Sequence, residues 1–83
     1  MKLLYFAWMR QKIGRAEEEV APPPDVATVA QLVAWLRTQS PAHEAAFADT
    51  RLVRCAVNQD FAGPDAPVRM GDEVAFFPPV TGG

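Results

Sequence analysis

The chain has 83 residues, of which 49% are hydrophobic and 22% charged, so we expect one small domain of ordinary globular composition. Its formal net charge is −2 and its eight basic residues are scattered, which argues against nucleic-acid binding, because that binding needs clustered lysines and arginines. No segment approaches the roughly 20 apolar residues that span a bilayer, and Cys55 is the only cysteine, so we expect a cytoplasmic protein with no membrane partner.

The first part of the chain reads as two strands and a loop. Residues 2–9 predict a strand that is apolar on both faces, as a central strand would be. Gly14 and Arg15 indicate a turn, and residues 17–20 could return as a short antiparallel strand. Residues 21–25 contain three prolines, which donate no ladder hydrogen bonds, and we expect a loop there.

The main helix is predicted from a capping box. Thr28 is followed three residues later by Gln31, and Val29, Leu32 and Leu36 then repeat at helical spacing on one face. A second, shorter helix over residues 42–48 could begin after Ser40 and Pro41.

The last third of the chain predicts two more strands. Residues 52–58 form an apolar run followed by a turn, and residues 73–77 form the final strand. Two prolines keep residues 61–68 irregular, and no function is assigned to that stretch. The predicted order is β-β-α-(α)-β-β, an α+β arrangement.

The most informative feature is the end of the chain, Pro-Pro-Val-Thr-Gly-Gly. Pro78 and Pro79 favour an extended path away from the domain, because each fixes φ. Gly82 and Gly83 lack a Cβ and could pass through a channel too narrow for other residues. A carboxylate presented in this way suits a substrate for another protein's active site, whereas the alternative is a frayed terminus without a role.

This ending carries a family resemblance. The run Gly-Asp-Glu-Val-Ala-Phe-Phe-Pro-Pro-Val-Thr-Gly-Gly over residues 71–83, supported by residues 56–59, resembles the ubiquitin-like β-grasp sulfur carriers, and most closely the molybdopterin synthase small-subunit (molybdopterin-converting factor subunit 1) family. The resemblance implies a mixed sheet of four to five strands packed on one main helix. The domain would span residues 1–77 and a flexible Gly-Gly tail residues 78–83.

The resemblance also implies a chemistry. Gly83 would be adenylated with ATP by a separate activating enzyme, a ubiquitin-activating-like adenylyltransferase, and a sulfur donor protein would convert it to a thiocarboxylate. Its sulfur would build the dithiolene of molybdopterin from cyclic pyranopterin monophosphate. Thr81 and Gly82 would thread the tail into the partner's pocket. For Thr81, the alternative interpretation as a mere spacer stays equally open.

Partners follow from the same resemblance. A large synthase subunit would supply the catalytic pocket, and two copies of each subunit would form a heterotetramer. This chain would then be a subunit of a sulfurtransferase that binds no cofactor or metal itself.

An apolar surface is predicted for docking. Alternation places Phe77 on the sheet face opposite Phe76, where Leu4, Phe6 and Trp8 could join it, with Phe61 near the rim. Exposed apolar patches often bind partners, so Phe77, Phe6 and Phe61 are candidate docking residues. In the alternative, the short helix or a loop covers these rings.

Other chemically active side chains receive structural interpretations. Cys55 is expected to be a small buried apolar residue, the alternative being a sulfur-relay thiol. His43 has no metal-ligand cluster around it in sequence. Residues 17–19 are expected to be solvated, and Arg10 is interpreted as an exposed arginine at a strand end or a contact for an acidic partner.

Three other functions remain open at this stage. A sulfur carrier for thiamine synthesis would use the same tail chemistry. A ubiquitin-like protein modifier would be joined to lysines of other proteins through Gly83. A β-grasp docking module would leave the tail inert.

Overall fold

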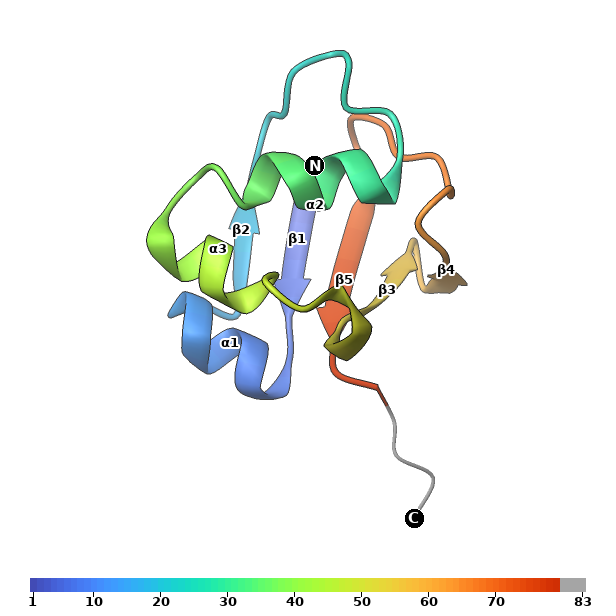
Figure 1. Cartoon of the computed structure of the whole chain (residues 1–83). Coiled ribbons are helices and arrows are strands. Elements are labelled where there is room, and N and C mark those ends of the chain that lie inside the picture. The colour runs from blue at the N-terminus through green and yellow to red at the C-terminus, as the bar shows by residue number, and fades with distance from the viewer. Residues whose placement is uncertain (80–83) are drawn as a thin grey trace.

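A computed structural model describes residues 1–79, which form one mixed sheet and three α-helices. The elements are β1 (Lys2–Tyr5), α1 (Ala7–Ile13), β2 (Glu17–Glu19), α2 (Val29–Leu36), α3 (Pro41–Ala46), the 3-10 turn η1 (Thr50–Leu52), β3 (Arg54–Val57), β4 (Asp60–Ala62) and β5 (Glu73–Phe77). Helices α2 and α3 lie on one face of the sheet, and α1 lies beside α3 beyond the carboxyl end of β1 (Figure 1). The strand order is β2-β1-β5-β3-β4, with β1 and β5 parallel and the other neighbours antiparallel. This confirms the predicted β-grasp class, with five strands.

The prediction of a strand over residues 2–9 was wrong beyond Tyr5. Phe6 is still extended, but Ala7 has φ 54° and turns the chain into α1. That helix buries Met9 and ends at Gly14, whose φ of 92° suits a residue without a Cβ. Trp8 and Arg10 therefore belong to a helix, and Trp8 packs against the core on the helical side.

Helix α2 forms where the capping box predicts it. Thr28 Oγ1 accepts a hydrogen bond from the Gln31 backbone N–H at 3.2 Å, and Gln31 Oε1 accepts one from the Thr28 backbone N–H at 3.2 Å. The next two backbone N–H groups, of Val29 and Ala30, donate to carbonyls of the 63–68 loop. This loop, whose role the sequence left open, thus satisfies the helix N-terminus.

The β3–β4 hairpin differs from the predicted loop. Leu52 belongs to η1, and residues 60–62 pair with β3 as strand β4. Asn58 and Gln59 form the two-residue connection, with φ of 51° and 73°. The Asn58 side chain donates to Asp72 and accepts from the Glu73 backbone N–H, so it ties this turn to the start of β5.

The core lies between the sheet and the helices. Alternation along β1 and β5 directs Leu3, Tyr5, Val74 and Phe76 toward the helices, and all four are buried. The Phe76 ring stacks on Tyr5 and meets Phe47 edge to face, with centroids 6.1 and 5.0 Å apart. Among residues 1–79, no helix is long and apolar enough to cross a membrane.

Candidate functional site: the tail exit and the open sheet face

The chain leaves the sheet at the carboxyl end of β5. Because β1 and β5 are parallel, their carboxyl ends lie at the same edge, and Phe6 N–H donates to the Phe76 carbonyl there. Pro78 and Pro79 follow directly and are half-buried. The predicted reactive Gly83 and the threading residues Thr81 and Gly82 lie outside the described residues, so their roles stay predictions.

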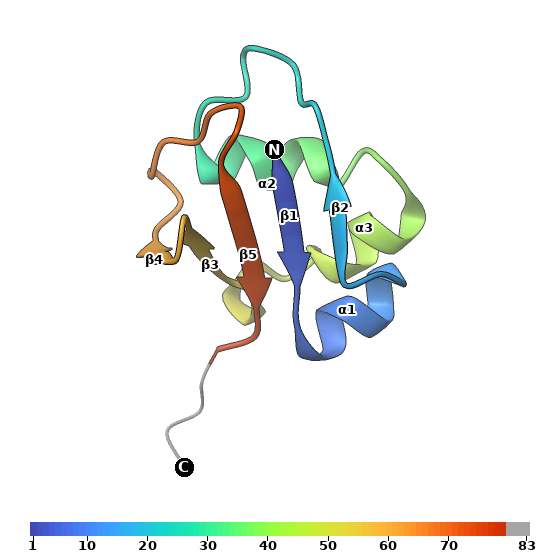
Figure 2. The ribbon, with the colours of Figure 1, turned by 180° about the vertical axis from the view of Figure 1, so that it is seen from behind.

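Within residues 1–79, no helix or loop covers the sheet face opposite α2 and α3 (Figure 2). The strand register places Leu4 beside Ala75, Ala75 beside Ala56, and Ala56 beside Phe61. We call this surface the open-face patch, and its apolar members are Leu4, Phe6, Ala56, Phe61, Ala75 and Phe77.

All three predicted docking rings belong to the open-face patch. Phe61 is 86% exposed, Phe6 is 49% exposed and Phe77 is half-buried. The Phe61 and Phe77 ring centroids are 5.9 Å apart. The alternative in which the short helix covers these rings is wrong, because α3 packs on the other face with α1. The patch is therefore available for docking next to the tail exit.

A buried polar cluster on the helical side was missed from the sequence. Glu18 Oε2 accepts hydrogen bonds from the Tyr5 hydroxyl at 2.6 Å and from His43 Nε2 at 2.7 Å. His43 Nδ1 lies 2.7 Å from Ser40 Oγ, which also caps α3 by accepting from the His43 backbone N–H. The cluster joins β1, β2 and α3, so its evident role is to hold these elements together.

The expectation that residues 17–19 are all solvated was wrong for Glu18, whose side chain is only 11% exposed. Burial alone would raise the pKa of Glu18, but hydrogen bonds from His43 and Tyr5 outweigh it and hold that pKa below its ordinary value. Burial, reinforced by the hydrogen bond to Glu18, raises the pKa of Tyr5. The sequence contained one signal for the burial of Glu18. Side chains alternate along a strand, so the middle residue of residues 17–19 faces the side of the sheet opposite to that of Glu17 and Glu19.

Cys55 is buried as expected, and burial raises the pKa of its thiol to about 11, which disfavours a relay nucleophile. Within residues 1–79, no group of three or more His, Cys, Asp or Glu side chains could hold a metal ion.

Comparison with known proteins relates this geometry to a family. The model of the ThiS family matches residues 3–83. The molybdopterin synthase sulfur carrier subunit of Escherichia coli (strain K12) is 45% identical over 83 residues, which cover 100% of this chain and 99% of that protein.

Two solved structures are also similar over nearly their full length. A putative molybdopterin converting factor, subunit 1, from Pyrococcus furiosus is 34% identical with a TM-score of 0.76, and the match covers 95% of each chain. Small archaeal modifier protein 1 of Haloferax volcanii is 28% identical with a TM-score of 0.78, and the match covers 96% of this chain and 97% of that one.

Proposed function

The chain belongs to the ThiS family, and we propose that it is a sulfur carrier that serves as the small subunit of a molybdopterin synthase in molybdenum cofactor biosynthesis. The observation that carries this proposal is the 45% identity to a molybdopterin synthase sulfur carrier subunit over all 83 residues. The match includes the Gly-Gly ending and the strands that form the open-face patch. It favours the molybdopterin branch over thiamine synthesis.

The proposed chemistry takes place at Gly83. A carboxylate is a poor acyl donor, so an adenylating enzyme must first join it to the AMP part of ATP, with release of pyrophosphate. Sulfur delivered at the oxidation level of sulfide then attacks the acyl carbon and displaces AMP, which leaves a thiocarboxylate. That sulfur is transferred to cyclic pyranopterin monophosphate, and two charged carriers are needed for one dithiolene. On this proposal the chain binds no cofactor, and Thr81 and Gly82 fit the narrow entrance.

The proposed partners act at different steps of sulfur transfer. A large synthase subunit holds the pterin and docks on the open-face patch, and two copies of each subunit form a heterotetramer. The adenylyltransferase and the sulfur donor protein act earlier on the same tail. A cytoplasmic location is consistent with a single, buried Cys55.

Mass spectrometry of protein from the native host tests the central step. A C-terminal fragment should carry sulfur in place of one carboxylate oxygen at Gly83. The fragment is needed because oxidation of Met1, Met9 or Met70 changes the intact mass by nearly the same amount. Normal molybdopterin formation after deletion of Gly83 would overturn the proposal.

Docking is tested by replacing Phe77 with alanine. The variant should bind the large subunit more weakly while losing less stability than a core ring would, because Phe77 is only half-buried. A loss of about 3–5 kcal/mol of unfolding free energy would instead assign the ring to the core.

A second candidate function is protein modification through Gly83. It is favoured by the 28% identity to small archaeal modifier protein 1 over nearly the whole chain. Lysine-linked adducts of this chain in the native host would support it.

A further inference from the structure

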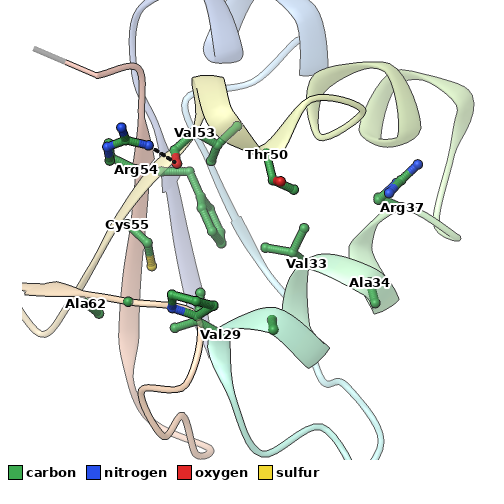
Figure 3. A pocket seen from close by; sticks show the side chains of 13 residues that line it. Val29, Val33, Ala34, Arg37, Thr50, Val53, Arg54, Cys55 and Ala62 are labelled. Carbon is green, nitrogen blue, oxygen red and sulfur yellow. Dashed lines mark hydrogen bonds between the residues drawn. The ribbon is translucent and has the colours of Figure 1, made fainter.

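A groove on the helical side has no part in the function proposed so far. It lies between helix α2 and the β3–β4 hairpin and has a volume of about 550 Å³ (Figure 3). Val33 and Ala34 line it from α2, and Ala62 lines it from β4. Val53, which precedes β3, and the core residue Phe76 also line it. This volume lies within the roughly 300–1,000 Å³ range of ligand pockets, so a short run of apolar side chains could enter.

The charges around the groove have one sign. Its lining contains Arg37 and Arg54 but no aspartate or glutamate. Arg37 is already paired with Glu44, at 3.0 and 2.7 Å. Arg54 lies beside Phe77 in the strand register, at the rim where the groove meets the open-face patch. Among residues 1–79 it donates only to backbone carbonyls, at 3.2 and 3.3 Å, so its charge is not neutralised by a carboxylate of that region. The groove therefore complements an apolar group that carries a negative charge near Arg54.

The groove is also continuous with the open-face patch. A second hollow contains both Phe61 and Phe77, and it shares Arg54, Cys55 and Ala62 with the groove. A protein docked on those two rings would thus reach the groove by passing around β3 and β4. This continuity favours a segment of that same protein over a free small molecule.

We propose that the protein that docks on the open-face patch also inserts an apolar segment bearing a carboxylate into the α2–β3 groove, with the carboxylate paired to Arg54. The inference rests on the proposed function, because it assigns the large synthase subunit as that protein. The bound protein would then contact both faces of the sheet at β3 and β4. These contacts would fix the position of the end of β5, from which the tail departs.

The test measures binding of the large subunit from the same organism to variants of the full chain. Ala34→Trp fills the groove from an exposed helical position, and Ala45→Trp is its control on the exposed side of α3. We expect at least about a tenfold loss of affinity for Ala34→Trp, against less than about twofold for the control. Circular dichroism checks that both variants fold.

A second variant and a probe decide between occupants. Arg54→Gln should also weaken binding and reduce its salt dependence, because a charge pair is lost. Normal large-subunit affinity of a folded Ala34→Trp variant would overturn the inference. If the Ala34→Trp variant binds the large subunit normally and decanoate binds the wild-type groove saturably, the occupant is a free ligand and the inference is overturned. If Phe77→Ala also leaves binding unchanged, the docking proposed for the open-face patch fails separately.

Discussion

Replacing Glu18 with glutamine should lower the free energy of unfolding by about 2 kcal/mol at pH 7. The carboxylate accepts two short hydrogen bonds, from Tyr5 at 2.6 Å and His43 at 2.7 Å. A hydrogen bond to a charged group contributes about 1.5–3 kcal/mol and a neutral one about 0.5–1.5 kcal/mol, so each bond loses roughly 1 kcal/mol. Urea denaturation followed by circular dichroism measures the difference.

The pH dependence of that difference gives a second readout. The pKa of Glu18 is lower in the folded protein than in the unfolded chain, so the carboxylate contributes stability above its unfolded pKa of about 4.3. This contribution is lost as the pH falls through the folded pKa. The stability gap between the wild type and Glu18→Gln should therefore narrow below about pH 4.

The neighbouring carboxylates provide matched controls for Glu18. Glu17 and Glu19 are exposed, and Glu17 pairs with Lys2 at the surface at 3.3 Å. Their glutamine variants should change stability by less than about 0.5 kcal/mol. The reasoning would be refuted by a Glu18→Gln variant as stable as these controls, or by a gap that stays constant down to pH 3.

Three further predictions concern local structure. Ala7→Gly should raise the unfolding free energy by about 0.5–1 kcal/mol in urea denaturation, because φ at this position is 54°; a less stable variant would contradict the strain. Thr28→Ala should cost about 1 kcal/mol in the same assay, while Thr28→Asn should keep most of the cap. Alkylation of Cys55 should be slow at pH 7 and rise toward pH 11 in the folded protein, whereas equally fast reaction of the folded and urea-unfolded chains would contradict burial.

Elements with a local signal could be predicted from the sequence. Helix α2 carries its own start signal in Thr28 and Gln31 and its own apolar stripe. Strand β5 alternates between the core and the open face, which is why Phe77 was correctly placed opposite Phe76. In both cases neighbouring residues contain the information.

Elements that depend on distant contacts could not be predicted. The apolar run from Phe6 to Met9 fits a strand or a helix, and the turn at Ala7 is imposed on a residue that does not favour it. Strand β4 has three residues and exists through its pairing with β3. The Glu18–His43 contact joins residues 25 positions apart, so no local sequence pattern predicts that the two side chains meet.

The arrangement of the site separates two requirements that a carrier must meet. Docking benefits from rigid side chains, because rigid groups lose little conformational entropy when they are buried, and Phe6 and Phe77 are held at the ends of β1 and β5 by the sheet. On the proposed function, the tail must also enter several active sites, and two glycines without a Cβ would suit a narrow entrance. Since the parallel pairing of β1 and β5 brings both strand ends to one edge, a partner bound to the rings has the start of the tail at a fixed place. On this proposal, the side chains held by the sheet supply the binding energy, and the tail supplies the reactive group.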